Sequence, residues 1–133
     1  MGPNPSLLGI PVLQAVVFCA AVLSSQAQNL AADRELFETT CTPCHNDDQG
    51  GEPDLYGLTL NLHGVVGRRA ASVPGFEYSD ELRKSGIVWD EALIDTFITA
   101  PKRLFPGTRM ELPGVEDMKT RTGIIRYLRS LSQ

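Results

Sequence analysis

The sequence contains few cysteines and histidines and no basic tract. Three Cys and two His are present in 133 residues, so a closed four-ligand zinc site is hard to assemble. All twelve Lys and Arg residues lie at or after Arg34, and the formal net charge is −4. This composition gives no indication of binding to nucleic acid or to an anionic membrane surface. Internal repeats are absent, and we predict one small domain after the N-terminal segment.

The N-terminal segment lacks charged side chains and is almost wholly apolar from Leu7 to Leu23. Residues 25–27, Ser-Gln-Ala, resemble a small-x-small cleavage site. The apolar run is short for a membrane-spanning helix and contains Pro11, so we interpret residues 1–27 as a cleaved signal peptide. Because no basic residue precedes the run, an uncleaved anchor and a misassigned start codon are alternatives. We expect residues 28–133 to form the mature chain, exported to a bacterial periplasm.

One run reads Cys-Thr-Pro-Cys-His, the attachment signature of a c-type haem. The thiols of Cys41 and Cys44 can each add to a haem vinyl group, and the imidazole of His45 can then reach the iron. A redox-active dithiol, a structural disulfide and half of a zinc site are alternative interpretations. A redox pair does not need the histidine. Zinc would need further ligands, but Cys19 lies in the apolar N-terminal segment and His63 is the only other histidine. The sequence therefore favours one covalent haem c.

The second axial ligand of the iron must come from elsewhere in the chain, and Met110 is the best candidate. It follows the run Pro106–Arg109, in which a proline and a glycine can turn a loop close to a flat cofactor. A thioether is a soft ligand for iron. Met1 would leave with the signal peptide, and Met118 lies at the start of the last predicted helix. Met110 alone would more often be a packing residue, but downstream of a haem motif we interpret it as a ligand.

The hydrophobic pattern predicts a few helices separated by long loops. Residues 46–53 are expected to be loop, and residues 55–69 irregular chain rather than a strand. Leu93, Ile94, Phe97 and Ile98 form one apolar stripe. The predicted helices are Ala31 to about Thr40 with Asn29 as cap, Ser79–Lys84, Trp89–Thr99, a turn over Pro101–Leu104, and a last helix that begins at Glu116 or Asp117.

Several further segments occur in a fixed order after the haem motif. They are Asn61–Arg68, Pro74–Asp80, Gly86–Trp89, Pro101–Arg103, Pro106–Met110 and Arg126–Leu128. With these segments the chain resembles the class I cytochromes c, the family of mitochondrial cytochrome c and its close bacterial relatives. The likeness covers nearly the whole mature chain. It implies the all-α cytochrome c fold, in which a few helices and long loops wrap around one haem. It also implies His and Met axial ligands, and an electron-carrying rather than a catalytic role.

The resemblance also implies residues that surround the haem. Tyr78, Trp89 and Arg68 match family positions that hydrogen-bond to or neutralise an inner haem propionate, and Thr108 is expected to assist through its hydroxyl. A propionate near the apolar haem needs donors and positive charge to offset its desolvation. Simpler interpretations exist for each residue: Trp89 as a core aromatic, Tyr78 as a half-buried aromatic, and Arg68 as a solvated charge.

The chain departs from the family pattern in two places. It has an insertion between His45 and Asn61, and Leu60 stands where the family has a proline whose carbonyl accepts a hydrogen bond from the ligating imidazole. A similar run, Pro53–Gly57, lies upstream, so the carbonyl that orients the imidazole is open.

Two substitutions also remove polar groups that the family has near the haem. Phe97 replaces a tyrosine, and Leu82 replaces a residue that is often asparagine. We expect a drier pocket as a result. Phe37 and Tyr127 match the family contact between the first and last helices.

The function implied by the resemblance is that of a soluble, monomeric carrier that passes one electron through an exposed haem edge. Its partners would be transient redox proteins, such as an oxidase, a reductase or a dehydrogenase of a respiratory chain. Lys102, Arg103 and Arg109 would face a partly acidic partner, or would be ordinary surface charges. A peroxidase-like or ligand-binding haem protein, a thiol–disulfide oxidoreductase and a permanent subunit of a dehydrogenase complex are the rival functions.

Overall fold

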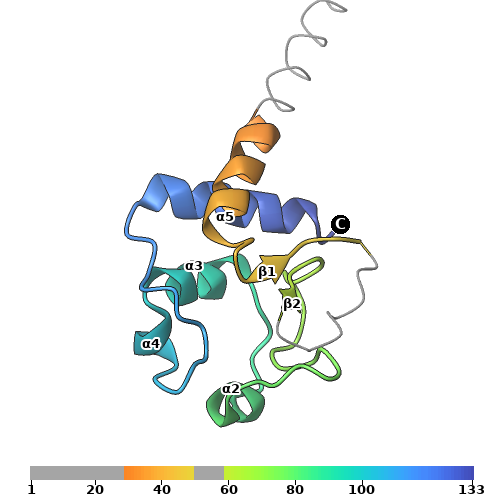
Figure 1. Cartoon of the computed structure of the whole chain (residues 1–133), viewed down its shortest axis with the longest axis vertical. Helices are drawn as coiled ribbons and strands as arrows, with labels where there is room; N and C mark the ends of the chain where they lie inside the picture. The colour runs from red at the N-terminus through yellow and green to blue at the C-terminus, as the bar shows by residue number, and fades with distance from the viewer. Residues whose placement is uncertain (1–28, 50–58) are drawn as a thin grey trace, which may run out of the picture.

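The computed structural model describes residues 29–49 and 59–133 (Figure 1). The predicted signal segment 1–27 and the run at residues 53–57 lie outside the described residues. A helix covers residues 29–40. The other elements are β1 (His45–Asn46), β2 (Leu60–Asn61), α2 (Asp80–Ser85), α3 (Glu91–Thr99), α4 (Pro101–Leu104) and α5 (Met118–Ser130). This mostly helical architecture confirms the predicted fold class.

The strands β1 and β2 correct the prediction of an irregular chain. They form a two-residue parallel ladder in which His45 pairs with Leu60, and Asn46 pairs with Asn61. The N–H of Leu62 then donates to the carbonyl of Asn46 at 2.8 Å. So short a ladder leaves no alternating pattern in the sequence, because it contains too few residues for a period. It nevertheless fixes which backbone groups lie beside the haem motif.

Three helices begin at a residue whose side chain caps the helix N-terminus. The side chains of Ser79, Asp90 and Asp117 accept hydrogen bonds from backbone N–H groups in the first turns of α2, α3 and α5. Helix α3 therefore begins after Trp89, and not at it. The prediction of Asn29 as the cap of the first helix was wrong, because residue 29 already lies inside that helix. Gly86 ends α2 in the left-handed region, with φ 66°.

The helix over residues 29–40 crosses α5, as Figure 1 shows. At this crossing Phe37 is 0% exposed, and its ring centroid lies 5.1 Å from that of Tyr127. The expected contact between these two residues is therefore present. Gly123 of α5 faces the same crossing. A Cβ added there would lie 2.5 Å from Leu36 Cδ1 and 2.9 Å from Asp33 Oδ1, so the close approach of the helices requires glycine at this position.

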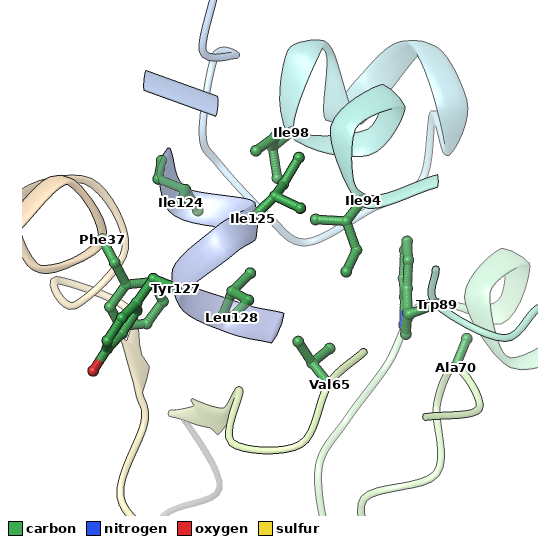
Figure 2. Close-up of a cluster of buried hydrophobic side chains, with 10 residues drawn as sticks. All are labelled: Phe37, Val65, Ala70, Trp89, Ile94, Ile98, Ile124, Ile125, Tyr127 and Leu128. Atoms are coloured by element: carbon green, nitrogen blue, oxygen red, sulfur yellow. The ribbon is translucent and has the colours of Figure 1, made fainter. Parts of the chain in front are cut away.

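The core lies between α3 and α5 and continues into the loops that precede α2 and α3. Ile94 and Ile98 of α3 face the apolar side of α5, as Figure 2 shows. The other members of the cluster are Phe37, Val65, Ala70, Trp89, Ile124, Ile125, Tyr127 and Leu128. The stripe predicted for α3 is confirmed. Among the described residues no helix is long and apolar enough to cross a membrane.

Candidate haem-binding site

The two cysteines lie on a tight turn directly after the first helix. Cys41 N–H still donates to the carbonyl of Phe37 at 2.7 Å, as in the helix. The carbonyl of Cys41 then accepts hydrogen bonds from Cys44 N–H (3.1 Å) and His45 N–H (2.9 Å). This turn holds both sulfur atoms and the imidazole on one short stretch of chain, and Cys44 is exposed.

The imidazole of His45 is oriented by a backbone carbonyl. Its Nδ1 lies 3.0 Å from the carbonyl oxygen of Leu60, the residue with which it pairs in the ladder. Because a carbonyl can only accept, Nδ1 carries the hydrogen, and Nε2 keeps a lone pair for a metal. Burial lowers the pKa of His45, while the Leu60 hydrogen bond opposes this effect. The neutral imidazole is the form that binds iron. Leu60 therefore supplies the orienting carbonyl.

The Cys41 thiol is in an environment that does not suit redox exchange. Burial raises its pKa to about 12, whereas a dithiol that exchanges disulfides needs a lowered thiol pKa. No disulfide joins Cys41 to Cys44. Within residues 29–49 and 59–133, no group of three or more His, Cys, Asp or Glu side chains is arranged to hold a metal ion. One histidine beside two cysteines on one turn is a donor set that fits haem c.

The segment with Met110 follows α4 as a short turn. Thr108 N–H donates to the carbonyl of Phe105 at 2.9 Å, and Met110 N–H donates to the Thr108 hydroxyl at 3.3 Å. The Thr108 hydroxyl thus orders the backbone at Met110. Met110 itself is half-buried. In Figure 1 the loop after α4 lies at the left of the view, apart from the β1–β2 ladder.

Arg68, Tyr78 and Trp89 form a group on one side of the core. Arg68 and Trp89 are adjacent through their backbones, because Trp89 N–H donates to the carbonyl of Arg68 at 2.9 Å. Arg68 and Tyr78 lie close enough for the charge of each to shift the pKa of the other. Trp89 is 8% exposed and packs on Phe97 and Phe105, with centroid distances of 5.2 and 6.5 Å. The structure therefore places Arg68 beside Trp89 in the backbone and within electrostatic range of Tyr78.

Arg68 has the environment of a cation that needs an anion. Its guanidinium donates to the carbonyls of Asn61 (2.9 Å) and His63 (3.2 Å), and burial lowers its pKa. Among the described residues no carboxylate lies within ion-pair distance of Arg68. A half-buried guanidinium that has only neutral acceptors is incompletely compensated. An added carboxylate, such as a haem propionate, would supply the missing charge, so this site also fits the cofactor.

Two of the three predicted docking cations are already paired. Lys102 Nζ lies 2.9 Å from Glu111 Oε2, and Arg109 Nη1 lies 2.9 Å from Glu77 Oε2. Arg103 has no carboxylate partner in the part of the chain that the structure describes. Sequence reasoning missed these pairs, because the partners are separated along the chain and have no fixed spacing.

Two other contacts were also missed. Glu81 of α2 accepts a hydrogen bond from the backbone of Gly107, and Asp47, just after the haem motif, accepts one from the Tyr127 hydroxyl. An acidic residue shortly after the motif was visible in the sequence, but nothing local pointed to its partner.

No family model matches the chain, but individual proteins do. The chain is 40% identical to cytochrome c2 of Rhodopila globiformis over 98 residues, which are 74% of this chain and 89% of that protein. It is 38% identical to cytochrome c of Kluyveromyces lactis over 93 residues, 70% of this chain and 82% of that protein. Cytochrome c2 of Rhodoplanes tepidamans is 36% identical over 101 residues, 76% and 91% of the two chains. The chain therefore belongs to the class I c-type cytochromes, electron-transfer proteins that carry covalently attached haem c.

Proposed function

We propose that this chain is a single-haem electron carrier with histidine and methionine as axial ligands. Cys41 and Cys44 would hold the haem covalently through their sulfur atoms, and His45 Nε2 and Met110 would be the ligands of its iron. The observation that carries the proposal is the hydrogen bond between His45 Nδ1 and the Leu60 carbonyl, at 3.0 Å, because it directs Nε2 away from the backbone and toward a ligand.

The haem, when bound, supplies a one-electron redox centre. The protein chain holds the proposed ligands in fixed positions and places charged side chains around the site. Leu60 holds the imidazole of His45 in one tautomer, and the Thr108 hydroxyl orders the backbone of Met110. With His45 and Met110 both bound to the iron, no coordination site would be open to a substrate, and the electron would pass through an exposed haem edge. Rigid ligands also keep the structural change on oxidation small.

Arg68, Tyr78 and Trp89 are proposed to stabilise an inner propionate. The half-buried guanidinium of Arg68 has no carboxylate partner in residues 29–49 and 59–133, and the buried hydroxyl of Tyr78 lies near it. A propionate in this place would pair with the cation and accept from the neighbouring donors. The pairing would offset the cost of burying both charges.

Export and partner binding are further parts of the proposal. We propose that residues 1–27 are a cleaved signal peptide and that residues 28–133 act in a bacterial periplasm, which the similarity to bacterial cytochromes c2 supports. The mature protein would be a monomer that meets its redox partners transiently. Arg103, together with Lys102 and Arg109, would lie at the docking surface. The exposure of these cations supports this assignment.

One purification tests the proposal. The protein is isolated from the native periplasm, its intact mass is measured under denaturing conditions, and spectra are recorded in both redox states. We expect a mass equal to residues 28–133 plus one haem, and the far-red absorption band that reports a methionine–Fe(III) bond. Met110→Ala should abolish that band and allow rapid binding of carbon monoxide, while Met118→Ala should leave both unchanged. Colourless protein, or rapid carbon monoxide binding by the unaltered protein, would refute the carrier function.

A further inference from the structure

The Met110 loop is the segment from Phe105 to Met110, and its tip, residues 106–109, has little packing of its own. Phe105 anchors the start of the loop in an aromatic cluster, with its ring centroid 5.8 Å from that of Phe97. Beyond it Pro106, Gly107 and Arg109 are exposed, and Met110 is only half-buried. The hydrogen bonds of Thr108 and Met110 described above stay within the loop. The position of the tip relative to the rest of the molecule must therefore depend on contacts made by its exposed residues.

Two polar contacts join this tip to the α2 region, by which we mean α2 and the residues just before it, 77–85. Gly107 N–H donates to Glu81 Oε2 at 2.7 Å, and Arg109 Nη1 lies 2.9 Å from Glu77 Oε2. A hydrogen bond from a backbone N–H to an ionised carboxylate is stronger than one between neutral groups. The approach is close: a Cβ on Gly107 would lie 3.1 Å from Glu81 Oε2. A side chain at position 107 would therefore press on this carboxylate.

The two carboxylates are themselves held in place by the fold. Tyr78 lies between them in the sequence, is 7% exposed, and accepts a hydrogen bond from Val73 N–H at 3.3 Å. Ser79 then caps α2, so that Glu81 lies in the first turn of a defined helix. The α2 region is thus a fixed support for a loop tip that is otherwise weakly attached.

We propose that Glu81, assisted by Glu77, is a positioning residue that holds the Met110 loop against α2 and so keeps the methionine on the iron. This inference deepens the proposed function and rests on Met110 as the axial ligand. Glu81 does not touch the reacting centre. It acts through the Gly107 amide, three residues before the ligand, and it limits how often the loop opens.

The test compares three single variants of the haem-loaded protein. Glu81→Ala removes the acceptor, and Glu81→Gln keeps an acceptor but removes its charge. Asp80→Ala is the matched control, because Asp80 is also an acidic residue in the first turn of α2, but pairs with Arg83 of the same helix. Three quantities are measured: hydrogen exchange of the Gly107 amide, the rate of cyanide binding to the oxidised protein, and the far-red methionine–iron band.

We expect Glu81→Ala to speed up both exchange at Gly107 and cyanide binding by about three- to tenfold, the range for loss of one partly solvated hydrogen bond. Cyanide can bind only after the methionine leaves, so its rate reports opening of the loop. Glu81→Gln should restore most of the slow binding, and Asp80→Ala should resemble the unaltered protein.

Two results would contradict the proposals, each a different one. If the unaltered protein lacks the methionine–iron band, the proposed ligation fails. If it has the band but Glu81→Ala exchanges and binds cyanide no faster than Asp80→Ala, the ligation stands and the positioning role of Glu81 is wrong.

Discussion

At the scale of single residues, two buried tyrosines show how neighbours modify the effect of burial. Burial raises the pKa of Tyr78, but a backbone hydrogen bond and the charge of Arg68 oppose the rise. Burial also raises the pKa of Tyr127, and here the carboxylate of Asp47 acts in the same direction, so that the pKa reaches about 12. Tyr127 therefore stays protonated and donates to Asp47 Oδ2 at 2.5 Å. Since Asp47 lies two residues after His45, this bond connects α5 to the haem motif.

Tyr127→Phe should lower the free energy of unfolding by about 1 to 2 kcal/mol at neutral pH, because Asp47 loses a donor. The pKa of Tyr127 is raised from 10.0 to about 12, so its contribution is complete below pH 10 and is lost as the pH rises through about 12. Urea unfolding of both proteins over a pH series measures this. The difference between them should be constant up to about pH 10 and shrink above it. A difference that persists in strong alkali would contradict the assignment.

At the scale of elements, the crossing of the first helix and α5 combines one glycine with one ion pair. Asp33 is 4% exposed, and both of its carboxylate oxygens accept from Arg126, at 2.7 and 2.6 Å. A bidentate pair of this kind has a defined geometry, so Asp33 cannot move freely. Gly123 leaves room for that carboxylate and for Leu36. The two helices therefore approach closely because a small residue and a fixed polar contact coincide.

Gly123→Ala should destabilise the protein by about 1 to 3 kcal/mol, the usual cost of overpacking a close contact. Alanine favours a helix by about 1 kcal/mol over glycine, so the steric cost must exceed that gain. Leu36 can rotate away, but Asp33 is held by Arg126, and the added Cβ would lie 2.9 Å from Asp33 Oδ1. Thr122→Ala, at the exposed neighbouring position of α5, is the control and should change stability little. Denaturant unfolding measures both. Equal or greater stability of Gly123→Ala would show that the helices can separate freely.

At the scale of the whole molecule, charge is balanced locally over much of the described surface. The full sequence has a formal net charge of −4, yet exposed carboxylates pair with Lys102 and Arg109. Surface pairs of this kind contribute little to stability, but they reduce the positive potential that a partner meets. Arg103 of α4 has no carboxylate partner in the described residues, so its charge is not balanced locally.

The docking assignment predicts a local effect of charge on association. The double variant Lys102→Gln/Arg103→Gln should slow oxidation by ferricyanide, an anion, by roughly threefold or more at low ionic strength. The effect should decrease at about 0.15 M salt, where the Debye length is about 8 Å. Arg34→Gln/Arg129→Gln changes the net charge equally at exposed positions of other helices and should slow the reaction less. Stopped-flow kinetics measure all three proteins. Equal slowing by both double variants would mean that only the total charge matters.

The amino-acid sequence by itself determined the parts of this protein that depend on neighbouring residues. The haem motif, the apolar stripe of α3 and the start of the last helix at Asp117 were predicted, because each depends on residues within one or two turns of chain. The caps at Ser79 and Asp90 were not predicted, and the structure shows them. Asn29 was predicted wrongly as a cap, because it lies inside the first helix and one capping-type residue does not by itself mark a helix boundary.

The tertiary structure decided which distant groups meet. Any residue has a carbonyl, so only the pairing of β1 with β2 selects Leu60 as the partner of His45. Similarly, only packing brings Glu81 to Gly107 and Asp33 to Arg126. Such contacts join residues far apart in the chain through common chemical groups, and no local pattern marks them. The sequence therefore specified the haem-attachment motif, and the fold specified which distant groups contact and orient it.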